Sequence, residues 1–146
     1  MFKSQKLVFR FKFNHVILGR WSYHHTAPIN ALYGLHEALL ILKEIGIENS
    51  WKKHMDNHLM LREGLESLGI SYLVDEEDRL PQLNSIFIPD DVDDLASRQK
   101  LLNDFNLEIG AGLGVLTGKI WRIGLMGSSS TKSNINHCLE SIRKII

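Results

Sequence analysis

The stretch at residues 107–127 constrains the fold of this 146-residue chain more than any other part of the sequence. It reads LEIGAGLGVLTGKIWRIGLMG, in which two short apolar runs flank a glycine-rich turn. An apolar run bounded by turn signals is typical of a buried strand. The stretch therefore predicts two strands, at about 107–110 and 120–126, that are joined by a tight loop.

A single arginine, Arg122, lies inside the second predicted strand. Its apolar neighbours are Ile120, Trp121, Ile123 and Leu125. A permanent charge in such a strand is costly unless a partner neutralises it. The planar guanidinium of arginine matches a carboxylate with two parallel hydrogen bonds. Arg122 is therefore either half of a structural ion pair or the anchor of a ligand carboxylate, and the residues alone leave both readings open.

The glycines of this stretch do not match a nucleotide-binding motif. A P-loop has four residues between its glycines and a Ser or Thr after its lysine. Here three residues separate Gly114 from Gly118, and Ile120 follows Lys119. A dinucleotide fingerprint needs a helix directly after the glycines, whereas a strand is expected here. We expect these glycines to let the backbone turn tightly or approach another group closely.

Hydrophobic periodicity places helices and strands along the rest of the chain. Asp90 and Asp91 are expected to cap the third helix, and Ser128–Thr131 the last one. The expected helices are 29–45, 48–68, 92–105 and a final helix after Thr131, and the expected strands are 70–74, 83–88, 107–110 and 120–126. This order predicts an α+β fold with a small, mostly antiparallel sheet and helices packed on it.

Composition argues against several classes of protein. The chain is 44% hydrophobic and 23% charged, as expected for a globular domain with a core. Its net charge of 0 gives no reason to expect a nucleic-acid partner. No segment has the length and the apolar character of a membrane span. Cys138 is the single cysteine, which excludes an internal disulfide, and its place on an apolar helix face predicts a packed thiol.

Two other groups of polar residues could bind something. His54 and His58 have the spacing of metal ligands on a helix, but no third ligand follows a matching pattern, so we expect surface histidines and no metal site. Tyr23 and Thr26 precede the first helix. Hydroxyls beside the free N–H groups of a helix start can contact a phosphate. Thr26 as a simple N-cap is the alternative.

Several motifs occur together in an order that is typical of one family. They are YHHTxP at 23–28, ENSW at 48–51, RLP at 79–81, EIGxGLG at 108–114 and TGKxxRIGLMG at 117–127. Together they closely resemble the C-terminal part of alanine–glyoxylate (serine–pyruvate) aminotransferases, which are class V aminotransferases of PLP fold type I. The resemblance covers residues 22–146 as the C-terminal domain of that family. It leaves residues 1–21 as an unassigned basic segment.

The resemblance implies a role for each matching residue. Arg122 would bind the α-carboxylate of small amino acids and 2-oxo acids. Tyr23 and Thr26 would reach the phosphate of pyridoxal 5'-phosphate (PLP) in the neighbouring subunit of a homodimer. The implied reaction transfers an amino group from alanine or serine to glyoxylate. The Schiff-base lysine belongs to a large N-terminal domain that is not in this sequence, and Lys119 belongs to the arginine motif, so no catalytic residue is assigned.

Two questions stay open at this point. A non-catalytic ligand-binding or dimerisation module derived from the same fold is the alternative function. The family also implies a peroxisomal or mitochondrial location. The terminal residues 143–146 only faintly resemble a Ser-Lys-Leu signal. Residues 1–36 are basic and contain no acid, which fits either a mitochondrial presequence or a non-native extension. We favour the extension, because residues 1–20 do not resemble the family.

Overall fold

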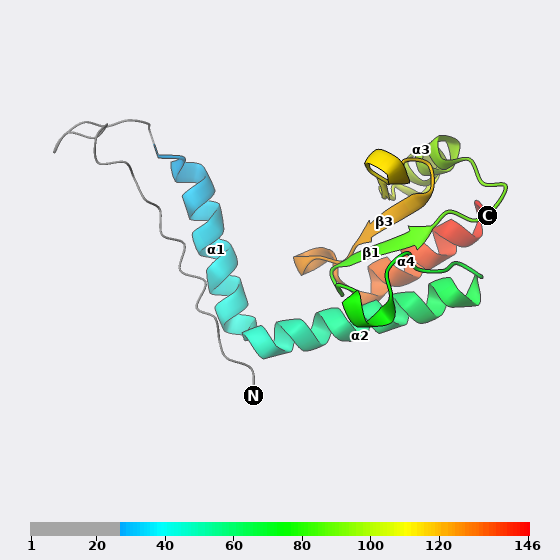
Figure 1. Ribbon diagram of the computed structural model, residues 1–146. Coiled ribbons are helices and arrows are strands. Elements are labelled where there is room, and N and C mark those ends of the chain that lie inside the picture. Colours follow the sequence, from blue (N-terminus) through cyan, green and yellow to red (C-terminus); the bar gives the residue numbers. More distant parts are fainter. Residues whose placement is uncertain (1–26) are drawn as a thin grey trace. The chain divides into compact units, whose positions relative to one another are not determined.

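The computed structural model describes residues 27–146, so the expectations for Tyr23, Thr26 and the basic N-terminal segment lie outside the described residues. The elements in chain order are α1 (Ile29–Ile45), α2 (Ile47–Ser67), β1 (Leu83–Phe87), α3 (Asp94–Phe105), β2 (Gly110–Ala111), β3 (Ile120–Gly124) and α4 (Lys132–Arg143), with single 3-10 turns at Glu76–Asp78, Gly114–Leu116 and Gly127–Ser129 (Figure 1). The predicted α+β class with a small antiparallel sheet is confirmed.

Strand β3 is the centre of the sheet, with β1 on one side and β2 on the other, both antiparallel to it. Because side chains alternate along a strand, Trp121 and Ile123 point to one face of the sheet and Arg122 points to the other. We call these the inner and the outer face. Register places Ser85 of β1 and Gly110 of β2 opposite Arg122, so these residues share the outer face.

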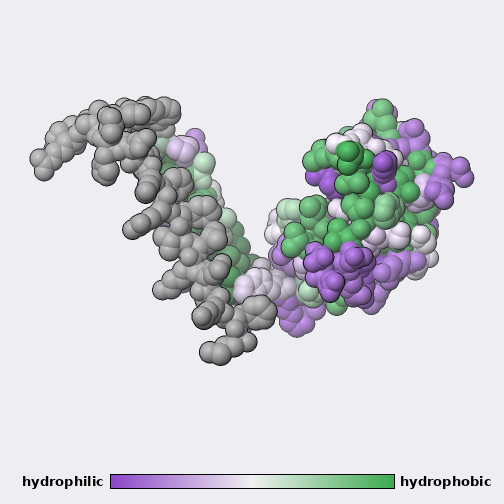
Figure 2. Space-filling view, viewed as in Figure 1, coloured by the Kyte–Doolittle hydropathy of each residue, from purple (hydrophilic) through white to green (hydrophobic). Residues whose placement is uncertain are grey.

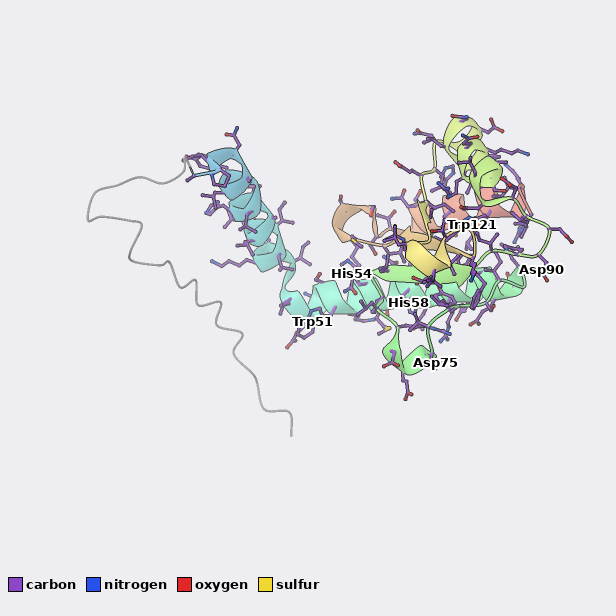
Figure 3. All side chains as sticks on the ribbon, turned by 45° about the horizontal axis from the view of Figure 1, so that its top comes forward. Trp51, His54, His58, Asp75, Asp90 and Trp121 are labelled. Carbon is purple, nitrogen blue, oxygen red and sulfur yellow. The ribbon has the colours of Figure 1, made fainter. Side chains whose placement is uncertain are left out.

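The hydrophobic core lies between the inner face and the helices α2 and α4 (Figure 1). Trp121, marked in Figure 3, is fully buried there. The other members of the core are Leu61, Leu65, Ile70, Ile86, Leu101, Ile109, Ile123, Leu125, Ile135, Cys138 and Ile142. Burial raises the pKa of the Cys138 thiol to about 12, so the prediction of a packed thiol is confirmed.

All four predicted strands differ from the observed ones: β1 and β3 end one and two residues earlier than expected, and the other two differ more. Residues 70–74 contribute one isolated bridge, between Tyr72 and Ile86, because only Leu73 N–H and Ser71 C=O bond to β1 before the chain turns away. The strand expected at 107–110 starts only at Gly110. The reason is that the Leu107 N–H bonds to the Leu101 carbonyl at the end of α3, so this segment first closes the helix.

One helix cap differs from the prediction. Asp93, and neither Asp90 nor Asp91, caps α3 by accepting a bond from the Ala96 N–H at 2.7 Å. Asp91 instead adopts a positive φ of 66° in the preceding turn. The predicted cap of the last helix is confirmed, since the Thr131 hydroxyl accepts from the Asn134 N–H at 3.1 Å.

The chain divides after Ile41 into two units, which are described separately. Helix α1 contains no buried residue, and Leu32, Leu35 and Leu39 are more than half exposed. On the unit that begins at Leu42, apolar and charged areas both reach the surface (Figure 2). Within residues 27–146, no helix combines the length and the apolarity needed to cross a membrane.

Candidate carboxylate-binding site

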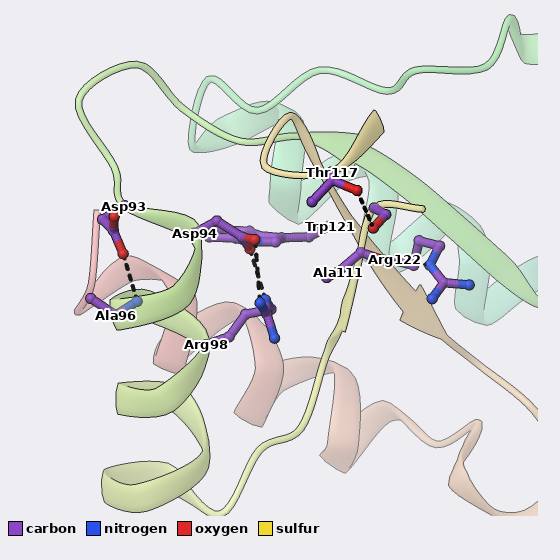
Figure 4. A network of polar contacts seen from close by, with 9 residues as sticks. Asp93, Asp94, Ala96, Arg98, Ala111, Thr117, Trp121 and Arg122 are labelled. Atoms are coloured by element: carbon purple, nitrogen blue, oxygen red, sulfur yellow. Dashed lines mark hydrogen bonds and ion pairs between the residues drawn. The ribbon is translucent and has the colours of Figure 1, made fainter. Parts of the chain in front are cut away.

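Arg122 lies half-buried on the outer face, in the middle of the central strand. Its Nε donates to the Ala111 carbonyl of β2 at 2.8 Å, and both residues are labelled in Figure 4. Its guanidinium lies close over Gly110, because a Cβ on that glycine would be 3.4 Å from Nη2 and 3.5 Å from Nε. The position of the guanidinium is therefore set by strand β3, by the Ala111 carbonyl and by the absence of a side chain at Gly110.

No carboxylate of residues 27–146 forms an ion pair with Arg122. The ion pairs within this part of the chain are Lys52–Asp56, Arg62–Glu66, Arg62–Glu76 and Arg98–Asp94. The structural ion pair, which was one of the two readings of Arg122, therefore finds no partner among these residues. The reading as a ligand anchor stays a prediction that this geometry permits.

The loop between β2 and β3 is built by close backbone contacts. A Cβ on Gly112 would lie 2.0 Å from the Leu116 carbonyl oxygen, so only glycine fits there. The Thr117 hydroxyl donates to the Gly114 carbonyl at 2.8 Å, and Gly112 N–H donates to the Ile120 carbonyl at 3.0 Å. The predicted close approach at these glycines is confirmed, and a strand follows the loop as expected.

A polar network beneath the site was missed by sequence reasoning. The Asp94 carboxylate accepts from Arg98 Nε at 2.7 Å and from the indole N–H of Trp121 at 3.0 Å. Figure 4 shows this carboxylate beside Arg98 and Trp121, with Arg122 next along the strand. The hydrogen bonds from Arg98, followed by the one from Trp121, hold the pKa of Asp94 below its ordinary value. The Asp94–Arg98 spacing of four residues was the only signal in the sequence.

The expectation of surface histidines is wrong. His54 and His58 are buried on α2 (Figure 3). The Nδ1 of His54 lies 2.7 Å from the Ser50 carbonyl, and its Nε2 accepts from the Gly127 N–H at 3.3 Å. The Nδ1 of His58 lies 2.6 Å from the side-chain oxygen of Asn84. These two rings connect α2 to the sheet and to the turn after β3. Hydrophobic periodicity along a helix does not predict such contacts between distant residues. Residues 27–146 hold no group of three or more possible metal ligands.

The surroundings of the lysines and of Arg122 bear on which groups this part of the chain could bind. A lysine that forms a Schiff base is activated by desolvation or by a neighbouring charge. All seven lysines of residues 27–146, Lys119 included, are exposed. Arg122, by contrast, offers Nη groups that take part in no ion pair within the described residues.

Comparisons with known proteins decide the family. The sequence model of the Aminotransferase class-V family matches residues 10–135. The chain belongs to the class V aminotransferases. It is 40% identical over 125 residues to alanine–glyoxylate aminotransferase of Callithrix jacchus and 32% identical over 123 residues to (S)-ureidoglycine–glyoxylate transaminase of Bacillus subtilis. These matches cover 85% and 84% of the chain but 30% of each relative, so this class V chain spans less than a third of their length.

Comparisons with solved structures agree with this assignment. Alanine–glyoxylate aminotransferase from Nostoc sp. superposes with a TM-score of 0.80 at 45% identity, covering 85% of this chain and 33% of that one. Pyridoxamine–pyruvate aminotransferase from Mesorhizobium loti reaches the same TM-score at 24% identity over 86% of this chain and 32% of that one, a likeness of fold alone. The resemblance found in the sequence motifs and the fold type are thus confirmed.

Proposed function

We propose that this segment forms the substrate-carboxylate end of a PLP-dependent transaminase. The proposed reaction moves an amino group from alanine or serine to glyoxylate, giving glycine and pyruvate or hydroxypyruvate. The observation that carries the proposal is the position of Arg122, a half-buried guanidinium without an ion-pair partner in residues 27–146. Family membership and the two glyoxylate-dependent relatives support it.

Arg122 would act by binding and orienting. Its Nη groups would donate two hydrogen bonds to the α-carboxylate that every amino-acid and 2-oxo-acid substrate of this class carries. The Nε bond to Ala111 limits rotation of the guanidinium, so the carboxylate would be held in one direction. A fixed carboxylate places the substrate's α-carbon, which lowers the entropic part of the barrier. PLP, when bound, supplies the electron sink for the reaction.

We also propose that the cofactor contacts come from elsewhere. Tyr23 and Thr26 would contact the phosphate of a PLP bound by the neighbouring subunit of a homodimer. The exposure of every lysine in residues 27–146 supports the view that the Schiff-base lysine is supplied by the rest of the enzyme. The apolar, uncovered side chains of α1 support packing against such further protein. On this view the isolated chain is inactive.

A second candidate is a non-catalytic ligand-binding or dimerisation module that keeps the fold. The same exposed lysines are equally consistent with it, because they offer no activated amine. The compartment is a further proposal, either peroxisome or mitochondrion. A fluorescent fusion of residues 1–22 that stays cytosolic would exclude the presequence.

Borohydride trapping with PLP tests the cofactor proposal. We expect the 146-residue chain to give only scattered, substoichiometric labelling of exposed lysines. Peptide mapping of the reduced adducts distinguishes this from specific attachment. A stoichiometric adduct at one lysine, reversed by alanine before reduction, would show that the chain carries its own cofactor lysine and would contradict the proposal.

An experiment with an assembled enzyme distinguishes the transaminase proposal from the proposal of a non-catalytic module. Residues 27–146 would replace the matching segment of the Nostoc enzyme, with that unmodified enzyme as the control. Transamination of alanine and glyoxylate that depends on Arg122 would support the transaminase. A chimera that folds, binds PLP and shows no turnover would favour the module.

A further inference from the structure

The guanidinium of Arg122 has one of its two hydrogen-bonding edges already in use. Arginine can grip a carboxylate side-on, through Nε and one Nη, or end-on, through both Nη groups. The Nε–H of Arg122 is bonded to the Ala111 carbonyl at 2.8 Å. Only the end-on edge of Arg122 therefore remains available for a bidentate contact.

Gly110 is what allows the guanidinium to take this position. It lies opposite Arg122 in the β2–β3 register. A Cβ at Gly110 would lie 3.4 Å from Nη2 and 3.5 Å from Nε, which are ordinary van der Waals contacts. A β-branched residue such as valine would add two methyl groups to a Cβ that already touches the guanidinium. We therefore expect glycine or alanine at this position to permit the bond to Ala111 and a β-branched residue to displace the guanidinium.

We propose that Gly110 and the Ala111 carbonyl are the positioning elements that make Arg122 grip its ligand end-on. Gly110 would not touch the ligand, so it is a positioning residue and its effect passes through the guanidinium. The inference rests on the proposed function, because it assumes that the ligand of Arg122 is a carboxylate. It adds to that function a reason why residue 110 is small and a prediction of which variants keep the site.

The matched variants are Gly110→Ala and Gly110→Val. Valine favours a strand more than glycine does, so a loss of binding in Gly110→Val cannot be ascribed to a weaker sheet if the melting temperature is kept. We expect Gly110→Val to free Nε–H from Ala111 and to weaken carboxylate binding by roughly tenfold, the scale of one lost hydrogen bond to a charged group. Gly110→Ala should stay close to the original chain in both respects.

The first test uses NMR on the full 146-residue chain with acetate as the probe. The Arg122 Nε–H resonance is assigned by its disappearance in Arg122→Lys. In the original chain and in Gly110→Ala we expect this proton to exchange slowly with water and to shift as acetate is added. In Gly110→Val we expect fast exchange and a weaker response to acetate, with the backbone amides of the core unchanged.

The outcomes separate this inference from the function it rests on. Slow Nε–H exchange and unchanged acetate affinity in Gly110→Val would overturn the positioning role and leave Arg122 as a carboxylate anchor. An original chain whose Arg122 resonance does not respond to acetate would contradict the anchor and the inference with it. In the chimeric enzyme, the inference further requires that Gly110→Val raise KM for alanine and glyoxylate alike, while PLP retention stays unchanged.

Discussion

The two faces of the sheet differ in how their polar groups are satisfied. On the inner face, the buried Asn84 accepts from the Tyr72 hydroxyl at 3.1 Å and lies 2.6 Å from His58. The indole N–H of Trp121 is likewise bonded, to Asp94. On the outer face, the Arg122 side chain donates from Nε to Ala111, and its Nη groups have no ion-pair partner in residues 27–146. Buried polar groups that are hydrogen-bonded to one another stabilise the fold, whereas a guanidinium without an ion-pair partner is available to bind a ligand.

This difference lies within one strand of five residues. Trp121 and Arg122 are adjacent in β3, and the alternation of side chains sends one into the core and the other to the opposite face. Substitutions at neighbouring positions should therefore change different properties. The core residue should control the free energy of unfolding, and the arginine should control ligand binding. The following predictions test this separation.

Trp121→Ala should have the largest effect. The side chain is completely buried, and truncating a buried tryptophan removes about 3–5 kcal/mol from the free energy of unfolding. Denaturant titration followed by circular dichroism measures this loss. Trp121→Phe is the control, because it keeps most of the volume and should cost distinctly less. Equal losses for the two variants would show that the indole N–H bond to Asp94, and not packing, is what matters at Trp121.

Arg122→Lys should be the next largest change, and it should appear in kinetics. In the chimeric enzyme, lysine keeps the charge but loses the planar fork, so binding should weaken by about 1.5–3 kcal/mol, or roughly 10- to 150-fold in kcat/KM. The loss should be the same for alanine and serine, because both carry the α-carboxylate. A lower melting temperature with normal kinetics would identify Arg122 as a structural residue. The proposed difference between the inner and the outer face would then not hold.

Asp94→Asn should remove an acid-dependent part of the stability. Because Arg98 lowers the pKa of Asp94 in the folded chain, this carboxylate stabilises the fold above its unfolded pKa of about 3.9. That contribution is lost as the pH falls through the lower folded pKa. The variant should lose about 1 kcal/mol at neutral pH, on the scale of a partly exposed ion pair.

Melting temperatures across the acid range check this pH dependence. The curves of the original chain and of Asp94→Asn should converge at low pH. Asp93→Asn is the matched control, since asparagine caps a helix about as well as aspartate does. A difference between the original chain and Asp94→Asn that does not depend on pH would contradict the assigned ion pair.

Phe87→Thr should have the smallest effect on stability. Phe87 is 41% exposed on the outer face of β1, and threonine also suits a strand. We expect the free energy of unfolding to change by less than about 1 kcal/mol. The neighbouring Ile86 is fully buried on the inner face, so Ile86→Thr should cost several times more. Similar losses at the two positions would mean that the outer face is covered in solution.

Local sequence patterns predicted where helices begin and end. Periodicity gave the bounds of α1 at 29–45, and the hydroxyl of Thr131 identified the start of α4. The prediction of a strand at 70–74 was wrong, because this segment pairs with β1 only through a single bridge to Ile86 while its apolar side chains pack on the core. Pattern alone does not distinguish a paired strand from an extended segment that packs.

Contacts between distant residues could not be predicted. Asp94 meets Trp121 across 27 positions, and His54 meets Gly127 across 73. Such pairs are set by how strands and helices pack, and no spacing rule encodes them. For the same reason, the sequence left Arg122 open between an ion pair and an anchor until the register placed Gly110 and Ser85 beside it. The roles of Tyr23 and Thr26 stay predictions from the family motif.

The buried thiol of Cys138 can be used to measure how often the folded chain opens locally. It is the single cysteine among the 146 residues, it is 4% exposed, and burial raises its pKa to about 12. Because the thiolate is the nucleophile that attacks thiol reagents, these reagents should modify the folded chain only when α4 separates from the sheet. The rate of alkylation would then count these openings directly. It would do so without a spectroscopic label and at concentrations low enough to avoid self-association.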